Sequence, residues 1–484
     1  MAERSTRSVN IRLRPSEHRI ILVIGDLIAS GLAVVGAYYT WLGYSWYKLI
    51  ATGISIVRAI RFFPSVQVPF WFYLMPIIWV MLLIELYDPH SAASRRRTLR
   101  GIAVAAFVGL VFYSLIFLTY RDPEALPRII VGAFLLYASI LTLSWRMLYI
   151  RFYTSSGLMR RILVVGAGKA GHTLARLYQK MNPPPFQFVG FIDDDPDKVN
   201  KMFEDFPVLG NSAQLLQVIE DQHITDIVVG IMGVMRGITF QSILDAQEHG
   251  VEVVPMPTLY EEMVGRVPIH HLESDWLIRS FVDQARVSGF YELFKRLLDI
   301  LGGLVGLLVF AIIFPFASLA TLIDTGFPIF YSQERLGKGG ALFVIRKFRT
   351  MYQNAEADGK ARPAAENDPR VTRVGNFLRK TRLDELPQFW NVLRGDMSLV
   401  GPRAERPELV AEYQRQIPFY RARLLVKPGL TGWAQVNYPY GASVEDARAK
   451  LSYDLYYVKH RSLLLDLLIL VATVRVVLFQ RGAR

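Results

Sequence analysis

The sequence predicts a membrane protein of mixed α/β class. We expect a four-helix transmembrane bundle, a Rossmann-like α/β domain, and a mainly helical domain that returns to the membrane through a re-entrant helix. Three observations predict this: four long apolar stretches in the first third, a strand that enters a glycine-rich turn, and a further apolar segment followed by motifs rich in Lys and Arg. The expected boundaries are 1–155, 156–285 and 286–484, with the re-entrant helix at 295–323.

The composition of the chain excludes several classes of protein and of functional site. With 484 residues, 52% hydrophobic, the chain is too long for one ordinary domain and too apolar to be wholly soluble. It contains no cysteine, which excludes disulfides, thiolate metal sites and cysteine nucleophiles. The net charge of +13 fits nucleic acid, anionic lipid or a phosphorylated substrate. Because no nucleic-acid-reading motif occurs, we expect no nucleic acid partner.

The four apolar stretches lie at 19–43, 68–87, 101–120 and 128–150. Each is long enough to cross a hydrocarbon core of roughly 30 Å. Arginines gather before the first stretch, between the second and third, and after the fourth, so the positive-inside rule places these segments in the cytoplasm. The loop between the first and second stretches is also basic, which weakens the difference in charge between the two sides. We interpret the helices as an anchor, in which Asp26 is either functional or reaches the interface.

The middle of the chain has the pattern of a doubly wound parallel sheet. RILVVGAGKAG places Gly166, Gly168 and Gly171 in a strand-to-helix turn, as in dinucleotide-binding folds. The next strand ends at Asp193, where such folds hold a ribose. Further strands are expected at 225–231 and 251–256. These four residues are the candidate nucleotide site, although the same turn also occurs in sheets that bind nothing.

Tyr291 and Lys295 form a Y-x-x-x-K pair, the spacing found in short-chain dehydrogenases. Together with the glycine turn, the pair suggests an alternative function, an NAD-dependent membrane sugar-nucleotide dehydratase or epimerase. However, Leu297 begins a long apolar segment where such enzymes need a soluble strand and substrate lobe. We therefore interpret the pair as a coincidence.

The apolar segment 300–323 is long enough to span the bilayer but contains Pro315, which kinks or breaks a helix. A Pro-kinked fifth span is the simpler physical reading. A crossing would, however, put the rest of the chain outside the cell, away from nucleotide-activated substrates. A re-entrant helix would keep both flanking domains in the cytoplasm.

The last third contains adjacent acids, Asp384 and Glu385, in a basic setting. Thr381 and Asp384 could form a capping box. We prefer a helix that starts at Asp384, because Pro387 then falls in its first turn, and that ends at Gly395. An acid at a helix N-terminus keeps a low proton affinity, so we expect an ionised Asp384 where a phosphoryl group docks. One carboxylate could attack phosphorus while the other holds a hard cation such as Mg²⁺.

Seven ordered blocks over residues 290–484 resemble the bacterial polyprenyl-phosphate hexose-1-phosphate transferases, the large monotopic phosphoglycosyl transferases that begin exopolysaccharide and O-antigen assembly. Besides the broken apolar helix, the blocks are KRLLDI, QERLGKGG, RKFRTM, TRLDELPQFWNVLRGDMSLVGPR, KPGLTGWAQV and YDLYYVKHRSLLLDL. The resemblance implies a catalytic domain on the cytoplasmic face of the bacterial inner membrane, with membrane lipid as a partner.

The resemblance also implies a two-step exchange. Asp384 would attack the β-phosphorus of a UDP-sugar and release UMP, and undecaprenyl phosphate would then take the sugar-phosphate from the enzyme. Glu385 would bind Mg²⁺, while Lys347 and Arg403 would hold phosphate or nucleotide. A homodimer is compatible with several membrane helices, and nothing in the motifs identifies the hexose.

Other expectations accompany this site. The resemblance implies that Asp454 supports it, and we add Arg349 to the substrate-binding residues because it stands beside Lys347. Ala404 follows Arg403 where the family usually has proline, which leaves base recognition in doubt. The terminal run 463–479 is expected to be an interfacial amphipathic helix.

Overall fold

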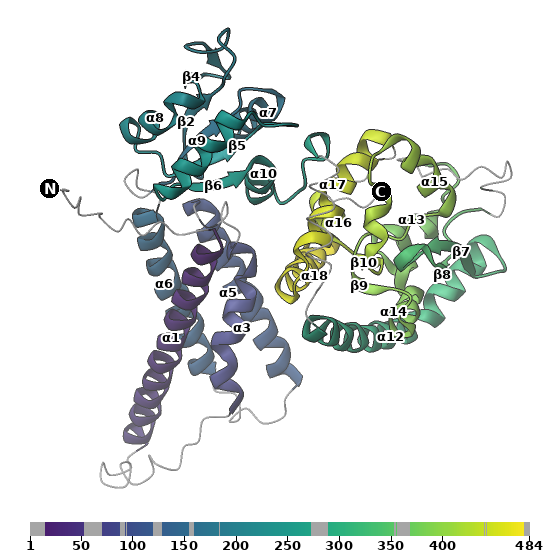
Figure 1. Cartoon of the computed structure of the whole chain (residues 1–484). Coiled ribbons are helices and arrows are strands. Elements are labelled where there is room, and N and C mark those ends of the chain that lie inside the picture. Colours follow the sequence, from purple (N-terminus) through teal and green to yellow (C-terminus); the bar gives the residue numbers. More distant parts are fainter. Residues whose placement is uncertain are drawn as a thin grey trace. The chain divides into compact units, whose positions relative to one another are not determined.

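This computed structural model describes residues 15–52, 70–87, 92, 94–119, 128–153, 159–182, 184–272, 289–352, 355, 368–439, 441 and 443–478. The chain forms two compact units (Figure 1). One comprises Met1–Ile231 with Met235–Val254, and the other comprises Met232–Val234 with Pro255–Arg484. Each unit is described by itself below.

Three of the four expected membrane spans are long helices in the first unit. They are α1 (Pro15–Ala51), α5 (Arg95–Thr119) and α6 (Arg128–Tyr153). By length and composition, each is apolar enough to cross a membrane. Helix α1 packs closely along α6, because Gly25 leaves room for the indole ring of Trp145.

The second expected span, 68–87, is wrong as a continuous helix. It consists of a 3₁₀ turn η2 (Phe70–Leu74), the eight-residue helix α3 (Met75–Leu82) and a 3₁₀ turn η3 (Ile84–Tyr87). Pro76 stands in the first turn of α3 and lacks a backbone N–H, so it favours a helix start there. A continuous helical ladder from residue 70 does not form.

Asp26 does not reach toward water. Its Oδ2 atom accepts a hydrogen bond of 2.6 Å from Nη2 of Arg146 in α6, and the two side chains are 0% and 1% exposed. Arg146 also donates from Nη1 to the carbonyl oxygen of Leu86 at 3.0 Å. This buried ion pair ties α1, η3 and α6 together, so its role here is structural.

We expect Asp26→Ala to destabilise the helix bundle by about 3–5 kcal/mol, because it leaves the Arg146 charge buried without a counter-ion. Thermal unfolding in detergent, followed by tryptophan fluorescence, measures the effect. Arg96→Ala is the control, because Arg96 is an exposed charge on α5. Equal melting temperatures for the two variants would contradict this structural role.

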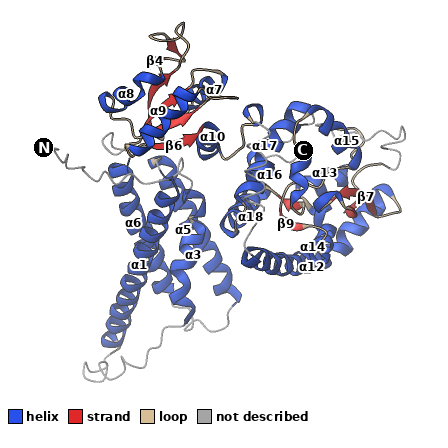
Figure 2. Ribbon diagram, in the orientation of Figure 1, coloured by secondary structure: helices blue, strands red, loops and turns tan. Residues whose placement is uncertain are grey.

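The α/β part of this unit is a six-stranded sheet of order β3-β4-β2-β1-β5-β6 (Figure 2). The central strand β1 (Arg161–Val165) pairs in parallel with β2 (Gln187–Ile192) and with β5 (Asp226–Val229). Strand β2 also pairs in parallel with β4 (Phe206–Gly210). The expected doubly wound parallel sheet is thus present, with the antiparallel edge strand β3 (Met202–Phe203) added.

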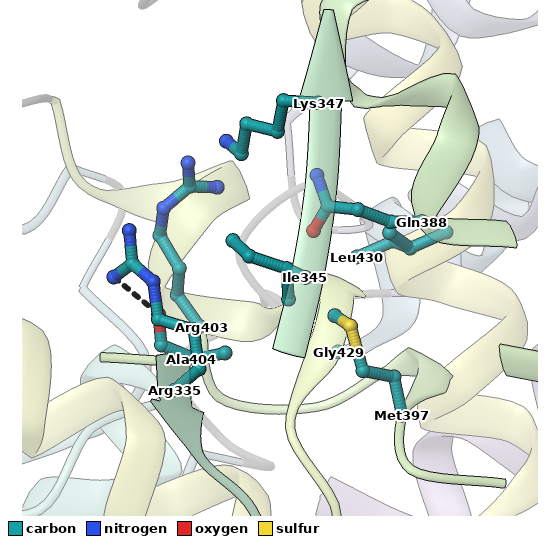
Figure 3. Close-up of a pocket in the computed structure, with 9 residues that line it drawn as sticks. All are labelled: Arg335, Ile345, Lys347, Gln388, Met397, Arg403, Ala404, Gly429 and Leu430. Carbon is teal, nitrogen blue, oxygen red and sulfur yellow. Dashed lines mark hydrogen bonds between the residues drawn. The ribbon is translucent and has the colours of Figure 1, made fainter. Parts of the chain in front are cut away.

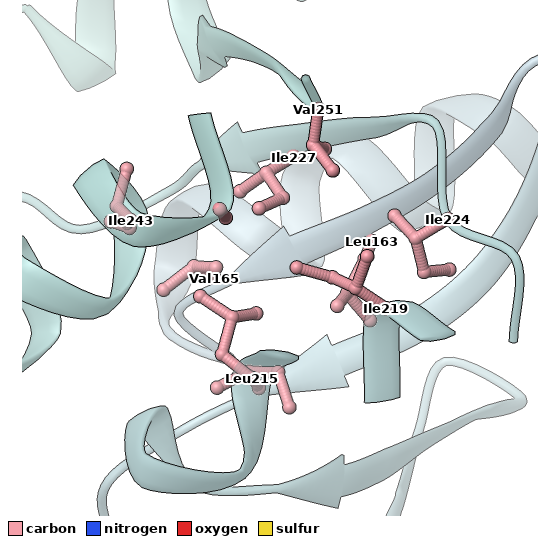
Figure 4. Packing of buried hydrophobic residues seen from close by; sticks show 10 residues of the cluster. Leu163, Val165, Leu215, Ile219, Ile224, Ile227, Ile243 and Val251 are labelled. Carbon is pink, nitrogen blue, oxygen red and sulfur yellow. The ribbon is translucent and has the colours of Figure 1, made fainter. Parts of the chain in front are cut away.

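Helices cover this sheet because its central strand is apolar on both faces. On one face, Leu163 and Val165 of β1 lie under side chains from α8 (Leu215–Asp221) and α9 (Gly237–Glu248), as Figure 4 shows. The remaining elements of this part are α7 (Lys169–Gln179), η4 (Ser212–Gln214) and β6 (Glu252–Pro255).

The second unit is mainly helical and contains two small sheets. Strands β7 (Phe330–Leu336) and β8 (Leu342–Phe348) form an antiparallel hairpin around η6 (Lys338–Gly340), and β9 (Ser398–Val400) pairs in parallel with β10 (Gly429–Thr431). Its helices are α10 (Met256–Val264), η5 (Ile269–His271), α12 (Gly289–Thr325), α13 (Arg373–Lys380), η7 (Leu383–Gln388), α14 (Phe389–Arg394), α15 (Pro407–Gln416), η8 (Tyr420–Leu425), α16 (Trp433–Asn437), α17 (Val444–His460) and α18 (Leu463–Leu478).

Two apolar helices of this unit differ from the expectations in detail. Pro315 does not end α12, which runs for 37 residues around it. Helix α18 runs through 16 described residues, and Asp466, an acid inside the run expected to be amphipathic, is fully buried instead of exposed on a polar face. Its Oδ2 atom accepts a hydrogen bond of 3.0 Å from Nζ of Lys295, so this acid fastens α18 to α12.

Candidate active site

The predicted site residues of the second unit are Lys347 on β8, Asp384 and Glu385 on η7, and Arg403 in the segment that follows β9. Lys347 Nζ donates to Glu385 Oε1 at 2.6 Å, and Arg403 Nη2 donates to the same oxygen at 2.8 Å. Lys347 lies near the end of β8, where the hairpin register pairs it with Tyr331. The fold therefore gathers two cations around the second acid of the pair.

The helix that was expected to start at Asp384 begins later in the chain. Asp384 and Glu385 lie in η7, a 3₁₀ helix, and the α-helix α14 begins only at Phe389. Pro387 cannot donate a backbone hydrogen bond, which is consistent with 3₁₀ geometry before α14. The expected end is confirmed, because Gly395 adopts φ +94° at the C-terminus of α14.

The alternative capping box is also absent. Thr381 is the residue that ends α13, and its hydroxyl donates to the carbonyl oxygen of Phe377 at 2.8 Å. Arg382 follows in the left-handed region with φ +59°, which turns the chain into η7. Asp384 is therefore not tied up in capping backbone donors.

Asp384 is buried, and no side-chain hydrogen bond from another described residue holds its carboxylate. Burial, followed by the charge of Glu385, raises the pKa of Asp384 to about 6, against the lowering effect of Lys347, Arg379 and Arg382. The expected low proton affinity is thus wrong. At neutral pH the group is still mainly ionised.

Glu385 behaves in the opposite way. Burial disfavours its charge, but Lys347 and Arg403 together outweigh burial and hold the pKa of Glu385 well below its usual value. Burial in turn lowers the pKa of Lys347. The two adjacent acids therefore differ: Lys347 and Arg403 balance the charge of Glu385 and lower its pKa, whereas burial and the charge of Glu385 raise the pKa of Asp384.

We expect any reaction that uses the Asp384 carboxylate to slow as the pH falls through about 6. A raised pKa of about 6 leaves roughly a tenth of the group ionised at pH 5, against about nine tenths at pH 7. The initial rate should therefore fall roughly tenfold between pH 7 and pH 5. Rates that stay constant down to pH 4.5, in a protein whose melting temperature is unchanged, would contradict the assignment.

A pocket adjoins the cluster (Figure 3). Lys347 and Arg403 line it, together with Arg335 and Gln388, which the sequence interpretation did not identify. Its other lining residues are Ile345, Met397, Ala404, Gly429 and Leu430. Arg335 lies in the block QERLGKGG and Gln388 stands four residues after Asp384, so motifs in the sequence point to both residues.

Asp454 lies behind this cluster. Its Oδ2 atom is 2.8 Å from Nη2 of Arg423, and the same Arg423 atom donates to the carbonyl oxygen of Arg403 at 3.0 Å. Burial raises the pKa of Asp454 to about 6 although Arg423 opposes the shift. Asp454 thus supports Arg403 indirectly. Arg349 lies one residue past β8 and does not line the described pocket.

The two adjacent acids suit a particular kind of metal site. Within the described ranges, no group of three or more His, Cys, Asp or Glu side chains could hold a metal ion. Mg²⁺, however, commonly binds through one or two carboxylates and takes its other ligands from phosphates and water. Asp384 and Glu385 are two such carboxylates, although Lys347 and Arg403 already donate to Glu385, so Mg²⁺ binding here stays a prediction.

Comparisons with known proteins identify the family of the chain. A profile of the bacterial sugar transferase family matches residues 290–480, and one of a CoA-binding domain matches residues 83–231. A UDP-N-acetylgalactosamine-undecaprenyl-phosphate N-acetylgalactosaminephosphotransferase from Aeromonas hydrophila is 42% identical, over 48% of this chain and 54% of that protein. A UDP-galactose-lipid carrier transferase from Erwinia amylovora is 31% identical, over 67% of this chain and 69% of that protein. The chain belongs to the bacterial sugar transferase family.

The coverage of these relatives is partial. The chain spans about half the length of the Aeromonas protein. A solved structure, the UDP-D-quinovosamine 4-dehydrogenase from Vibrio fischeri, is 23% identical over 25% of this chain and 98% of that one, with a TM-score of 0.20. That score is too low to support a conclusion.

In this bacterial sugar transferase, the Tyr291/Lys295 pair has structural contacts. Tyr291 OH donates to Asp466 Oδ2 at 3.1 Å, and Lys295 Nζ donates to that oxygen and to the carbonyl oxygen of Val400 at 3.0 Å each. Tyr457 OH completes the network by donating to Asp466 Oδ1 at 2.8 Å. The pair therefore joins α12 to β9, α17 and α18, which supports the interpretation of its spacing as a coincidence.

The candidate nucleotide residues of the α/β domain form a tightly packed turn. Gly166 has φ +109°, and a side chain at Gly171 would meet the carbonyl oxygen of Gly166. A side chain at Gly168 would meet nothing. Asp193 Oδ2 accepts a hydrogen bond of 2.8 Å from the backbone N–H of Ala167. Asp193 thus already binds the turn from which a phosphate would receive its hydrogen bonds, so nucleotide binding there stays a prediction.

Proposed function

We propose that this protein transfers a hexose-1-phosphate from a UDP-sugar to undecaprenyl phosphate, through an aspartyl sugar-phosphate intermediate with release of UMP. The observation that carries the proposal is the pairing of a weakly compensated carboxylate, Asp384, with Glu385 held by Lys347 and Arg403. The names of the relatives, which include sugar-phosphate transferases that act on undecaprenyl phosphate, support the substrate classes.

In the first step, an oxygen of Asp384 attacks the β-phosphorus of the UDP-sugar. The bond between that phosphorus and the bridging oxygen breaks, and its electron pair leaves with UMP. Lys347 and Arg403 offset the negative charge that develops on the phosphate oxygens, because both line the pocket (Figure 3) and both donate to Glu385. Their existing contacts with Glu385 hold them in position before substrate binds.

In the second step, a phosphate oxygen of undecaprenyl phosphate attacks the phosphorus of the adduct. The acyl-phosphate bond breaks and returns the electron pair to Asp384, which regenerates the carboxylate and gives a lipid-linked diphosphosugar. Mg²⁺ held by Glu385, with Asp384 beside it, would supply charge neutralisation at the diphosphate. The product is suited to start exopolysaccharide or O-antigen assembly on the cytoplasmic face of the inner membrane.

The packing of α12 supports a re-entrant arrangement. Near its start, Asp299 Oδ1 accepts hydrogen bonds of 2.8 Å from Ser398 Oγ and from the backbone N–H of Leu399. Eighteen residues later, Ala317 packs in one cluster with Phe348 and Leu378. Eighteen helical residues rise about 27 Å, close to the thickness of the hydrocarbon core. A helix that crossed the bilayer could not contact one water-facing folded unit at both points.

The outer side of α12 suits lipid. Large apolar side chains along its whole length are exposed, and they can remain so only in an apolar surrounding or against a partner. They are Phe290, Leu293, Phe294, Leu297, Leu301, Leu304, Val305, Leu308, Val309, Ile312, Phe314, Phe316, Leu319 and Ile323. The helix therefore provides both the support for the site and its membrane contact.

We expect Glu248→Cys and Lys338→Cys to be labelled from the same side of the membrane. Both positions are exposed, they flank α12 in the sequence, and the native chain has no cysteine to interfere. Inverted and right-side-out vesicles, treated with a membrane-impermeant maleimide, distinguish the two sides. Labelling of the two positions from opposite sides would show that α12 crosses the membrane.

The decisive experiment for the reaction uses the purified full-length protein with radiolabelled UDP-hexoses, undecaprenyl phosphate and Mg²⁺. We expect stoichiometric UMP release and a lipid-linked diphosphosugar, and a panel of UDP-hexoses identifies the sugar. Without the lipid, a labelled sugar-phosphate should stay on the protein. Sugar-nucleotide dehydration without UMP release would instead support the dehydratase alternative.

A further inference from the structure

Residues 256–272, which we call the α10 segment, pack along α17 in the second unit. Glu261 of this segment is 2% exposed, and Nζ of Lys459 donates to its two carboxylate oxygens at 3.1 and 2.9 Å. Nε2 of His460 is 2.8 Å from Oε2 of the same carboxylate. One buried acid therefore binds the last turn of α17 through two neighbouring side chains.

A second set of contacts lies further along the α10 segment. The backbone N–H of Val267 donates to the carbonyl oxygen of Ser452 at 3.0 Å, and Val267 is 1% exposed. Nε1 of Trp433 in α16 donates to the carbonyl oxygen of Gly265 at 2.6 Å. The α10 segment is thus attached to α17 at Ser452 and again at the last turn of that helix.

Asp454 lies between these two points of attachment, two residues after Ser452 and five before Lys459. Ser452 and Lys459 share one face of α17, whereas Asp454 lies roughly 200° around the helix from Ser452. On that other side Asp454 pairs with Arg423 at 2.8 Å, and Arg423 donates to the carbonyl oxygen of Arg403. The α10 segment therefore holds one side of the helix turn whose other side supports Arg403.

We propose that Glu261 is a positioning residue for the UDP-sugar. By fixing the last turn of α17, Glu261 sets the place of Asp454, and with it that of Arg403. The proposal rests on the function proposed above, in which Arg403 neutralises phosphate oxygens. It assigns a role to a segment that lies between the two matched regions, 83–231 and 290–480. A displacement of about 1 Å at a reacting group can cost about 10²-fold in rate, so a contact outside the site can control it.

The test compares Glu261→Gln, which removes the buried charge, with Glu262→Gln, which changes an exposed acid on the same helix. We expect Glu261→Gln to raise the KM of adduct formation for the UDP-sugar about tenfold, because Arg403 loses its fixed place beside the phosphates. A purely structural role would lower the amount of folded protein, and so the apparent kcat, at an unchanged KM. Glu262→Gln should match the wild type in both constants.

A double-mutant cycle tests the route through α17. Asp454→Asn alone should also raise this KM, because it breaks the ion pair with Arg423. Adding Glu261→Gln to Asp454→Asn should change the KM by less than about twofold, since both substitutions act through the same contact. Independent effects that multiply in the double variant would show that Glu261 does not act through Asp454.

A milder pair of variants serves if Glu261→Gln fails to fold. Lys459→Met leaves His460 in contact with Glu261 and should still raise the KM, whereas Lys459→Arg keeps the charge and should retain the wild-type value. An unchanged KM in Lys459→Met, or in a folded Glu261→Gln, would overturn the positioning role.

A wild-type protein that forms no adduct from any UDP-hexose would instead contradict the proposed reaction. The dissociation constant of UDP, measured by calorimetry, then replaces the KM, because binding of phosphate by Arg403 does not depend on the reaction that follows. Glu261→Gln should weaken UDP binding in the same way. Equal dissociation constants in the wild type and Glu261→Gln would overturn the positioning role.

Discussion

Asp384→Asn should abolish the covalent adduct and lower overall turnover by at least about 10³-fold. The amide keeps the size of the side chain but cannot act as the anionic nucleophile, and losses of this order or larger follow removal of a nucleophile. Because Asp384 is buried without a side-chain hydrogen bond from another described residue, the substitution breaks no such contact in the site. The fold should therefore survive the change.

The measurement is retention of radiolabelled sugar-phosphate on purified protein, followed by release when undecaprenyl phosphate is added. Asp396→Asn is the control, because Asp396 lies in the same motif but contacts Arg394, at 3.4 Å, instead of the cluster. It should load normally. If Asp384→Asn loaded lipid at the wild-type rate, the proposed chemistry would be wrong.

Glu385→Gln should lower the rate of adduct formation by about 10²–10³-fold. The change removes the anion between Lys347 and Arg403 and the carboxylate proposed to hold Mg²⁺, and electrostatic contributions of this kind to transition states have that magnitude. Chelation of Mg²⁺ should stop loading by the wild type, and added Mg²⁺ should restore it. Glu334→Gln, an exposed position on β7, is the control.

The same variant gives a second, independent readout. The charge of Glu385 contributes to the raised pKa of Asp384, so its neutralisation should lower that pKa. The acid limb of the residual activity should then move below pH 6. An unchanged acid limb, together with full loading in the presence of a chelator, would show that Glu385 neither binds the metal nor influences Asp384.

Parts of the fold that depend on local pattern were predictable. The long apolar runs predicted α1, α5 and α6, and the apolar strand before the glycine turn predicted β1. Each of these patterns follows from the geometry of a single element. The missed strands β3 and β4 lie in MFEDFPVLG, where two acids and a proline obscure that pattern. The stretch 68–87 had the hydropathy of a span, but Pro76 decided where its helix starts.

In the candidate site, the sequence indicated Lys347, Asp384, Glu385 and Arg403 as members, through motif and resemblance. It could not supply their pairing, since the partners of Glu385 lie 38 and 18 residues away in the chain. The ionisation of Asp384 was misjudged for the same reason. Helix position favoured a low pKa, whereas burial and the neighbouring charge, which are properties of the packed site, raise it.

By itself, the sequence determined the kinds of element in this chain and the residue types available for phosphoryl chemistry, because these depend on neighbours within a few positions. Only the tertiary structure decided how those residues act. It placed Tyr291 and Lys295 in a hydrogen-bond network around the buried Asp466, and it joined Asp26 to Arg146. Burial and charge proximity set these outcomes, and both arise only when distant segments pack together.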